Sequence, residues 1–349
     1  MKKILVTGGT GYIGSHCAIL LLEKGYEVVL LDSHINSNPR TIRLIKNLCG
    51  RLNITTSNKL KTYQGDMRDI NILEKVFCDA IKIGKPFQGV MHFAGLKSVS
   101  ESLIDPLKYW DFNLTSTINL LKVMSKYSCN SIIFSSSATI YQANEDFKIG
   151  ELDSIDPINP YGNTKFVIEK FLSDIFFSEK NKWKIANLRY FNPIGAHESG
   201  LIGEDPRGIP NNIFPLIMNA ASKKIKQLKV YGDDWPTKDG TGVRDYIHVV
   251  DLAIGHIKAL EFLFENDPQV ISLNIGTGVG TSVLELIEIF QNVNNVEVPY
   301  CVVSRRTGDK ASIIANNSKS IKYLNWVPKR DVQKMCKDGW KWQGFNNKF

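Results

Sequence analysis

The sequence that decides the fold is Lys3-Ile4-Leu5-Val6-Thr7-Gly8-Gly9-Thr10-Gly11-Tyr12-Ile13-Gly14. Its apolar residues predict a buried strand, its glycines a tight turn, and the residues from Tyr12 onward a helix. A glycine turn lets the backbone approach a pyrophosphate closely, and the free N–H groups at a helix N-terminus carry partial positive charge. Glycines also occur in turns that bind nothing, so the motif needs support from its surroundings.

The first 190 residues alternate short apolar runs with segments of helical length. The runs predict strands at Lys3–Thr7, Glu27–Leu31, Leu60–Tyr63, Gly89–Phe93, Ser131–Ser135 and Lys184–Tyr190. Helices are predicted between them, among others at Tyr12–Lys24, Asp69–Ile81, Pro106–Tyr127 and Pro160–Ser178. Continuous apolar runs are typical of parallel strands that are covered on both faces. The alternation therefore predicts an α/β fold with a doubly wound parallel sheet of the Rossmann type.

An acidic residue at the end of the second predicted strand supports a dinucleotide site. Asp32 follows Gly14 by 18 residues, and a carboxylate at this place accepts hydrogen bonds from the hydroxyls of an adenosine ribose. It would repel a 2′-phosphate, so the sequence favours NAD over NADP. Asp66, at the end of the third predicted strand, is a candidate for contact with the adenine amino group or for an ordinary loop turn.

Tyr161 and Lys165 are four residues apart and share one face at the start of the helix predicted from Pro160. A tyrosine with a pKa of about 10 is a weak base at neutral pH, but a neighbouring ammonium group and an oxidised nicotinamide would both favour its phenolate form. Ser137 follows the fifth predicted strand, whose carboxyl end would face the cofactor. Together the three residues predict a site of proton and hydride transfer, although each pattern alone is common.

The rhythm of strands and helices ends after residue 190. Turn-rich stretches at Asn192–Asn212 and Gly232–Gly242 separate shorter elements, and the last predicted helix contains Trp340 and Trp342. We therefore divide the chain into a dinucleotide-binding domain at 1–191 and a smaller α/β domain at 192–349 that covers the carboxyl edge of the sheet. The stretch 242–264 is expected to return to the first domain.

The charge balance invites a nucleic-acid interpretation that the pattern of charges does not favour. The 349 residues include 43 Lys and Arg against 35 Asp and Glu, which gives a net charge of +8. The basic residues are scattered and form no run of five. Binding to nucleic acid would call for a basic stripe with interleaved aromatic residues, and none is visible.

Metal, disulfide and membrane roles are not expected either. The six cysteines are widely spaced without a Cys-x-x-Cys pair, and His248 with Asp251 has no third ligand nearby. No apolar run reaches about 18 residues and no secretory signal is recognisable. We expect a soluble cytoplasmic protein that does not act on membranes.

Several motifs are identified as those of the extended short-chain dehydrogenase/reductase family. They are the glycine motif, His92-Phe93-Ala94-Gly95-Leu96-Lys97, Ser135-Ser136-Ser137-Ala138-Thr139 and Tyr161-x-x-x-Lys165. Longer stretches resemble one branch of that family, the UDP-glucose 4-epimerases: Arg189–His197, Gly203–Pro206, Gly208–Asn212, Asp239–Val249 and Leu324-Asn325-Trp326. The resemblance extends from Lys3 to Trp342.

The resemblance implies an NAD molecule that stays bound throughout the reaction. The glycine turn would lie at the pyrophosphate, the loop after the second strand at the adenosine ribose, and the loop after the fourth strand under the dinucleotide. The residues that the resemblance implies for the cofactor are Gly8, Gly11, Tyr12, Ile13, Gly14, Asp32, Ser33, His34, Ile35, Asn36, Ser37, Asp66, Met67, Phe93, Ala94, Gly95, Leu96, Lys97, Asn113, Ser137, Tyr161, Lys165 and Phe191.

The reaction that the resemblance implies is the reversible epimerisation of UDP-galactose and UDP-glucose at C4. Tyr161 would act as the base on the 4′-hydroxyl while C4 gives a hydride to NAD⁺, with Ser137 relaying the proton and Lys165 holding the nicotinamide ribose. The resulting 4-keto sugar turns about its diphosphate link and receives the hydride on its other face. Redox chemistry is thus used without net redox change.

The resemblance also implies a firm hold on UDP by the smaller domain. Two arginines would neutralise the diphosphate, residues 229–231 would lie along the uracil, and an aspartate would accept from the uridine ribose. The implied substrate contacts are Ser137, Tyr161, Asn192, Asn212, Lys229, Val230, Tyr231, Arg244, Arg306 and Asp309. A homodimer is implied as well, packed through the helices of Pro106–Tyr127 and Pro160–Ser178.

Two alternatives concern the substrate and the chemistry. Ile313 aligns with a position where strict glucose/galactose epimerases carry Tyr and enzymes for N-acetyl sugars carry a small residue. Because Ile is intermediate in bulk, a UDP-N-acetylhexosamine 4-epimerase, or another nucleotide-sugar-modifying member of the family, stays open. The family's nucleotide-sugar 4,6-dehydratases carry an Asp-Glu acid/base pair where this chain has Ala138-Thr139. Dehydration is therefore disfavoured. A scaffold that only senses NAD is disfavoured by the intact Ser137, Tyr161 and Lys165.

Overall fold

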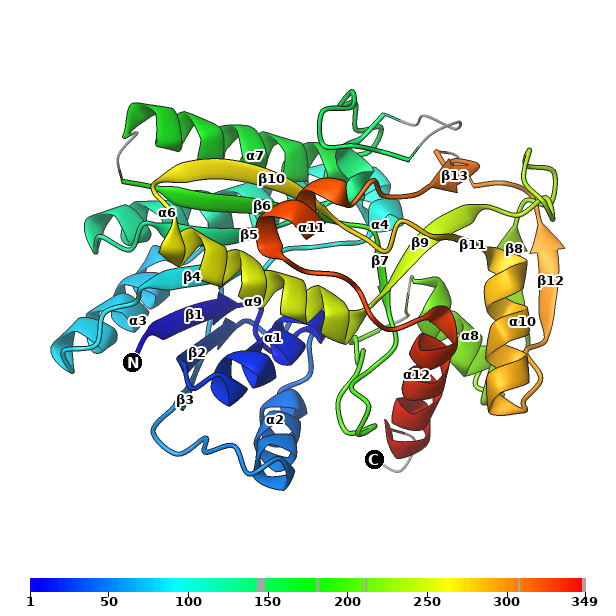
Figure 1. The fold of residues 1–349 in the computed structure, drawn as a ribbon, viewed down its shortest axis with the longest axis horizontal. Helices are drawn as coiled ribbons and strands as arrows, with labels where there is room; N and C mark the ends of the chain where they lie inside the picture. The colour runs from blue at the N-terminus through cyan, green and yellow to red at the C-terminus, as the bar shows by residue number, and fades with distance from the viewer. Residues whose placement is uncertain (143–147, 180–181, 209, 211, 307, 347–349) are drawn as a thin grey trace.

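A sheet of seven parallel strands organises the molecule (Figure 1). The structure, a computed structural model, describes residues 1–142, 148–179, 182–208, 210, 212–306 and 308–346. The strand order is β10-β6-β5-β4-β1-β2-β3. The strands are β1 (Lys3–Thr7), β2 (Glu27–Asp32), β3 (Leu60–Gln64), β4 (Gly89–His92), β5 (Ser131–Ser137), β6 (Lys184–Tyr190) and β10 (Gln269–Ile275). The predicted fold class is confirmed, and the seventh strand, β10, is an addition from the C-terminal half.

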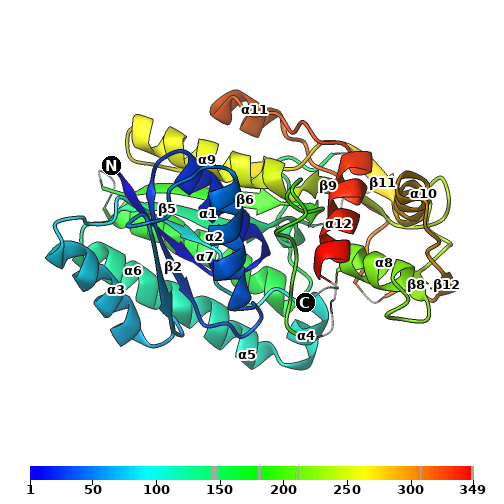
Figure 2. The same ribbon diagram turned by 90° about the horizontal axis from the view of Figure 1, so that it is seen from below.

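Helices cover both faces of the sheet, as Figure 2 shows from below. One face carries α1 (Tyr12–Glu23), α2 (Arg40–Arg51) and α9 (Val249–Glu265), and the other carries α3 (Ile70–Lys82), α6 (Ser116–Lys126) and α7 (Pro160–Ser178). Alternate residues of a strand point to opposite faces. Ile4 and Val6 accordingly belong to the core under α1 and α9, while Leu5 belongs to the core under α3 and α6. Continuous apolar runs are therefore needed because each run serves two cores.

The prediction of one continuous helix at Pro106–Tyr127 is wrong in the middle of that segment. The structure has α5 (Pro106–Trp110), a π-helical turn η1 (Asp111–Thr115) and then α6, and the short α4 (Val99–Ile104) precedes them. Asn113 is the buried residue of the π turn. Its Oδ1 accepts from Leu96 N at 2.7 Å, and its Nδ2 donates to Thr164 Oγ1 at 3.0 Å. π turns of this kind are frequent at functional sites, where they turn a side chain inward.

The smaller domain is built from two short sheets with helices beside them. One sheet contains β11 (Gly280–Ser282), β9 (Val243–His248) and β13 (Ser312–Ile313), with β7 (Asn192–Ile194) also paired to β9. The other pairs β8 (Leu228–Tyr231) with β12 (Tyr300–Val303). The helices are α8 (Ile213–Ala221), α10 (Val283–Asn294) and α12 (Val332–Asn346), and they enclose a core that includes Phe214, Tyr246 and Phe290.

The chain returns from the smaller domain to the large sheet. After β9, helix α9 packs against α1, and β10 then pairs in parallel with β6. The returning segment therefore runs from Val249 to Ile275, whereas β9, which lies within the stretch 242–264, belongs to the smaller sheet. Helix α11 (Ser318–Leu324) also lies against α9 and β10.

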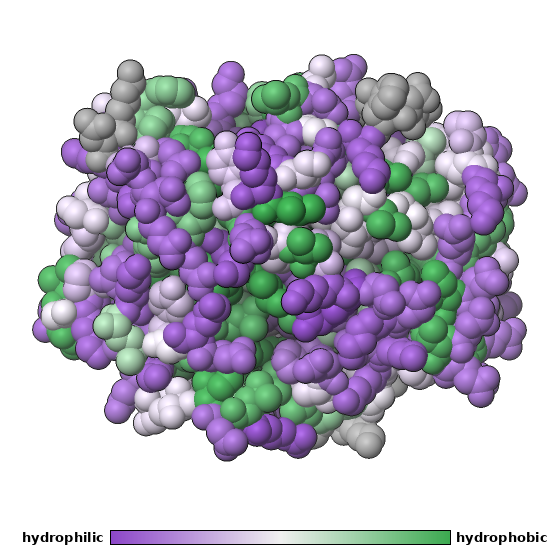
Figure 3. All heavy atoms as spheres, in the orientation of Figure 1, coloured by the Kyte–Doolittle hydropathy of each residue, from purple (hydrophilic) through white to green (hydrophobic). Residues whose placement is uncertain are grey.

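The surface gives no sign of one dominant patch on the face viewed in Figure 3, where hydrophilic residues are interrupted by small hydrophobic areas. None of the helices formed by the described residues combines the length and apolar character that a bilayer crossing requires. All six cysteines are free.

Candidate active site

A cleft of about 390 Å³ lies at the carboxyl edge of the sheet, between the sheet and the smaller domain. This volume is typical of small-molecule sites. Its walls come from the turn after β1, the ends of β2 to β6, the start of α7 and the segment that follows β7. The fold thus brings residues from the whole length of the chain to one place, as expected for the carboxyl edge of a parallel sheet.

The glycine turn is shaped by close contacts that exclude side chains. Gly8 has a φ of 65°, and a Cβ there would lie 2.8 Å from the backbone nitrogen of Ala94. A Cβ on Gly14 would lie 2.5 Å from the carbonyl oxygen of Gly8. The glycine-turn residues predicted to bind the cofactor all line the cleft: Gly8, Gly11, Tyr12, Ile13 and Gly14. The bare backbone at the start of α1 fits a pyrophosphate.

Asp32 organises the loop after β2. It is buried, and its carboxylate accepts from Thr10 N at 3.0 Å, His34 N at 2.9 Å and Ser37 Oγ at 2.8 Å. Of the predicted loop residues, those that line the cleft are Asp32, Ser33, Ile35, Asn36 and Ser37. His34 does not line it. His34 has a φ of 58°, and its ring Nδ1 lies 3.1 Å from Thr10 Oγ1. It therefore supports the conformation of the loop without lining the cleft.

Asp66 and Met67 lie at the next part of the cleft, beyond the end of β3. The Arg68 guanidinium forms hydrogen bonds to the Asp66 carboxylate, the shortest at 2.7 Å, and this holds the pKa of Asp66 below its usual value. The same guanidinium stacks on Phe112 at 3.5 Å from the ring centroid. Phe112 also lines the cleft and was not among the predicted site residues, because an aromatic residue carries no motif of its own.

The loop after β4 forms the floor of the cleft. Its five predicted residues, Phe93, Ala94, Gly95, Leu96 and Lys97, all line it. Asn113 does not line the cleft. It holds the loop from below through Leu96, and a Cβ on Gly95 would lie 3.0 Å from Asn113 Oδ1. Asn113 therefore acts on the loop rather than facing the cleft directly.

Tyr161, Lys165 and Ser137 meet at one side of the cleft. Asn159 caps α7 by accepting from Gly162 N at 2.8 Å, and Pro160 fits the first helical position. Lys165 Nζ donates to the carbonyl of Ser135 at 2.8 Å and lies 5.8 Å from the centroid of the Tyr161 ring. The helix start and the strand end therefore place the three predicted groups together.

The titration of this triad is governed by burial. Burial lowers the pKa of Lys165 to about 8. Burial also raises the pKa of Tyr161, and its hydrogen bond with Ser137 acts in the opposite direction. Ser137 Oγ accepts in addition from Thr139 N at 3.2 Å and Thr139 Oγ1 at 3.0 Å. A phenolate at Tyr161 therefore needs added positive charge, which an oxidised nicotinamide would supply.

A strap from the smaller domain crosses to the loop after β2. It consists of residues 203–207, of which Gly203, Glu204, Asp205 and Pro206 line the cleft. Asp205 pairs with Arg40 of α2 at 2.8 Å, and Arg207 Nη1 donates to the carbonyl of His34 at 3.0 Å. Glu204 accepts from Lys97 at 2.9 Å. These contacts were not predicted, although the motif Gly203–Pro206 marked the segment.

Residues predicted for the substrate fall into two groups. Asn192 and Asn212 line the cleft together with Ser137 and Tyr161, and so does Phe191, which was predicted for the cofactor. Ile209 and Asn211, which belong to the motif that ends at Asn212, lie outside the described residues.

The second group gathers beyond the cleft in the smaller domain. Arg244 lies 3.7 Å from Asp309, and Arg306 stacks on Tyr231 at 3.7 Å from the ring centroid. Asp309 N donates to Arg306 O at 3.2 Å, which joins the two pairs into one cluster. On β8, Lys229 is exposed, while the side chain of Val230 is buried in the domain core. The side chain of Val230 is therefore not available to a ligand.

Comparisons with known proteins identify the family of the chain. The family model described as GDP-mannose 4,6 dehydratase matches residues 5–339. The UDP-glucose 4-epimerase of Bacillus subtilis is 47% identical over 343 residues, which cover 98% of this chain and 97% of the relative.

Solved structures match over the whole fold. A UDP-glucose 4-epimerase from Stenotrophomonas maltophila with bound NAD and formylated UDP-arabinopyranose has a TM-score of 0.92 at 42% identity, covering 100% of this chain and 99% of that one. The enzyme from Bifidobacterium longum, in complex with NAD⁺ and UDP, has a TM-score of 0.92 at 43% identity, covering 99% of both chains. The chain therefore belongs to the extended short-chain dehydrogenase/reductase family and, within it, to the UDP-glucose 4-epimerases.

Proposed function

We propose that the protein interconverts UDP-galactose and UDP-glucose at C4 with a tightly bound NAD. The observation that carries the proposal is the meeting of Tyr161, Ser137 and Lys165 at the wall of a cleft whose other end has the glycine turn and Asp32. The relatives that share this fold bind NAD and uridine nucleotides. Proton transfer and dinucleotide binding are therefore joined in one site.

The cleft fits a dinucleotide by its chemistry. Its glycine turn offers backbone N–H groups to a pyrophosphate, and buried Asp32 offers a carboxylate to ribose hydroxyls. Lys165 would hold the nicotinamide ribose. When bound, NAD⁺ supplies a hydride acceptor and a positive charge.

The residues of the chain perform the proton transfers. Tyr161 takes the proton of the 4′-hydroxyl, and Ser137, which is hydrogen-bonded to Tyr161, orients that hydroxyl. Lys165 stays fixed by the carbonyl of Ser135 and adds positive charge beside the phenol. After oxidation of C4, Tyr161 returns the proton to the oxygen of the opposite epimer.

Epimerisation needs a sugar that turns while its nucleotide stays in place. We assign the firm hold to the cluster of Arg244, Arg306, Tyr231 and Asp309, where two guanidinium groups can bind the diphosphate. Asn192 and Asn212 at the cleft would contact the diphosphate and the sugar. The weaker polar contacts around the sugar leave it free to present either face.

One assay tests the function. The purified protein, given UDP-galactose and no added cofactor, should form UDP-glucose, and heat denaturation should release NAD. Tyr161→Phe is the matched control, since it keeps the ring but removes the hydroxyl. No conversion by the unaltered protein, together with no released NAD, would refute the proposal.

The same assay with UDP-N-acetylgalactosamine decides the alternative substrate. Ile313 packs against a small apolar cluster that includes Phe191 and Ala138, and of these residues Phe191 lines the cleft. The resemblance implies that bulk at this position limits the room for an N-acetyl group, so we expect the plain hexoses to be turned over faster. Ile313→Gly should shift the ratio of the two rates toward the N-acetyl sugar.

We also propose that the chain acts as a cytoplasmic homodimer. Exposed apolar residues gather on α4 and α5, beside α7: Leu103, Ile104 and Leu107 are 54%, 85% and 79% exposed. Such a cluster on the surface is typical of an interface. Light scattering should give twice the mass of the chain, and Ile104→Lys with Leu107→Lys should give the mass of one chain. A wild-type protein of single-chain mass would contradict the dimer.

A further inference from the structure

A buried ion pair lies directly beneath the catalytic end of α7. Arg189 of β6 binds Glu169 of α7 with Nε and Nη2, at 2.9 Å to Oε1 and 2.6 Å to Oε2. Both side chains are only 6% exposed. Ser136 Oγ donates to the same carboxylate at 2.5 Å. Glu169 therefore receives a two-pronged guanidinium contact and a hydroxyl contact in a place without solvent.

The position of this pair relates it to the catalytic residues. Tyr161, Lys165 and Glu169 follow each other at four-residue spacing, so they lie along one face of α7. Ser136 sits between Ser135, whose carbonyl holds Lys165, and Ser137, which bonds Tyr161. The same face of the helix is thus fastened to three consecutive residues of β5.

The register of β5 and β6 fixes the position of these contacts. Ser136 and Arg189 are direct neighbours on the paired strands β5 and β6. A shift of α7 by one turn would move Glu169 about 5.4 Å away from both partners. It would also leave a buried charge unpaired, which costs several kcal/mol. The pair therefore allows one position of the helix along the sheet.

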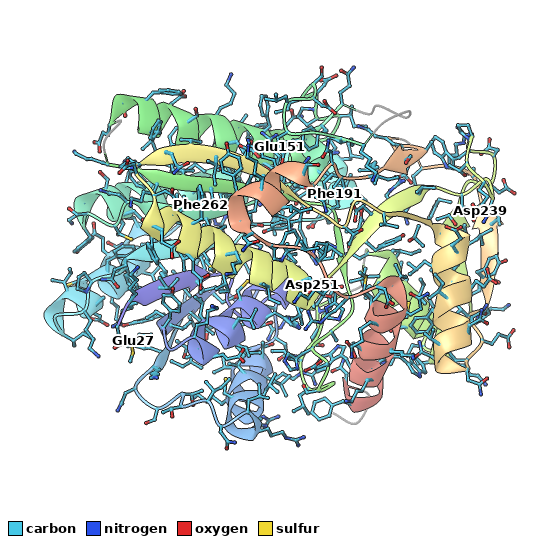
Figure 4. All side chains as sticks on the ribbon, viewed as in Figure 1. Glu27, Glu151, Phe191, Asp239, Asp251 and Phe262 are labelled. Atoms are coloured by element: carbon cyan, nitrogen blue, oxygen red, sulfur yellow. The ribbon has the colours of Figure 1, made fainter. Side chains whose placement is uncertain are left out.

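Arg189 is itself held by further groups at the carboxyl edge. Its Nη1 donates to Tyr141 OH at 2.9 Å and to the carbonyl of Glu151 at 3.0 Å. Tyr141 OH donates to Asn274 Oδ1 at 2.6 Å, and the Glu151 carboxylate accepts from Asn274 N at 2.7 Å. Figure 4 labels Glu151 among the side chains of the molecule. The guanidinium is therefore immobilised from the side opposite to Glu169.

We propose that Glu169 is a positioning residue for the reaction: through Arg189 and Ser136 it sets the register of α7, so that Tyr161 meets Ser137 at the reacting hydroxyl. It touches neither substrate nor cofactor. Glu169, Arg189 and Ser136 do not line the cleft. The inference rests on the proposed epimerase function.

The test is a kinetic isotope effect measured on Glu169→Gln. The variant keeps the length of the side chain and removes its charge, so the guanidinium contact loosens and α7 gains freedom. A displacement on the order of 1 Å costs about 10²-fold in rate, so kcat for UDP-galactose should fall by roughly that factor. KM and bound NAD should stay near the wild-type values. With UDP-galactose deuterated at C4, the isotope effect on kcat should rise, because hydride transfer becomes the slowest step.

A matched control separates positioning from loss of stability. Asp251 is a buried carboxylate on α9 that accepts from Arg330 at 2.5 Å and does not line the cleft. Asp251→Asn should lower the melting temperature while leaving kcat per bound NAD and the isotope effect unchanged. Ser136→Ala provides a milder second variant, which keeps the ion pair and should also raise the isotope effect.

The outcomes are distinct. If wild type turns over and folded Glu169→Gln matches it in kcat and isotope effect, the positioning role is refuted. A fall in kcat with an unchanged isotope effect would refute it too, since that is the result of fewer active molecules. If Glu169→Gln does not fold, Ser136→Ala decides by the same criterion. A wild-type protein without turnover would refute the proposed function itself.

Discussion

Replacing Lys165, the lysine that we propose for catalysis, should make the protein more stable. Lys165 is 4% exposed, and burial lowers its pKa from 10.5 to about 8. The folded state therefore disfavours the charged form that is present at neutral pH. At about 1.4 kcal/mol per pKa unit, the charged lysine costs roughly 3 kcal/mol of unfolding free energy.

Lys165→Met removes this cost and keeps an apolar stem of similar length. The Ser135 carbonyl loses its hydrogen bond from Nζ, which offsets about 1 kcal/mol. The free energy of unfolding of the variant should thus be higher than that of the wild type by on the order of 2 kcal/mol near pH 7. Its turnover should be largely lost. Stability and catalysis would move in opposite directions at one residue.

The pH dependence identifies the cause. Because the folded pKa lies below the unfolded value, the cost is fully present below about pH 8 and disappears as the pH rises toward 10.5. Urea unfolding of NAD-free wild type and variant at about pH 7 and about pH 10 should show a difference that shrinks from roughly 2 kcal/mol to below zero. A variant less stable than wild type at neutral pH, with a difference independent of pH, would show that burial of the charged lysine does not destabilise the fold.

Three further substitutions test the site. Tyr161→Phe should lower kcat by roughly 10²–10⁴ without weakening UDP binding, measured by turnover and by UDP titration; wild-type turnover would remove Tyr161 from its role. Asp32→Asn loses a charge-assisted contact of about 1.5–3 kcal/mol, so NAD should dissociate at least tenfold more readily, as measured by the NAD retained after gel filtration, and full retention would speak against the ribose contact. Arg244→Ala should raise KM for UDP-galactose by roughly 10–100-fold with little change in kcat; a defect confined to kcat would place Arg244 away from the UDP anchor.

Local signals explain why most of the sheet could be predicted. The glycine turn between β1 and α1 includes a contact within a few residues, the approach of Gly14 to the Gly8 carbonyl, and its glycines follow one another in the sequence. Strands β1, β2 and β4 to β6 contain buried runs that two helical layers must cover, and such runs are visible in the sequence, whereas β3 at the sheet edge is only partly buried. The Tyr161–Lys165 spacing is likewise a property of one helix.

Other features depend on distant partners and leave no local signal. Strand β10 begins with partly exposed Gln269 and Val270 at the sheet edge, so its apolar run is weaker. The π turn at η1 exists because Asn113 reaches Leu96 and Thr164, which lie 17 and 51 residues away. In the sequence, the residues of η1 continue the helical pattern of the segments on either side.

The polar network of the site shows the same limit. Glu169 and Arg189 are 20 residues apart, and their pairing follows from the β5–β6 register rather than from a motif. Glu204 is joined to Lys97 across 107 residues. A buried carboxylate of this kind can be recognised only once the fold has placed its cationic partner.

The late position of β10 in the chain has a consequence for synthesis on the ribosome. β6 ends at Tyr190, yet its outer neighbour is complete only at Ile275. At about 5–20 residues per second, translation of this interval takes on the order of 4–17 s. Throughout that time the nascent sheet has an open edge with unpaired N–H and C=O groups, the kind of surface that invites wrong strand pairing. The growing chain thus passes through a vulnerable period for the edge of β6, which ends when β10 emerges, pairs with β6 and becomes the outer strand.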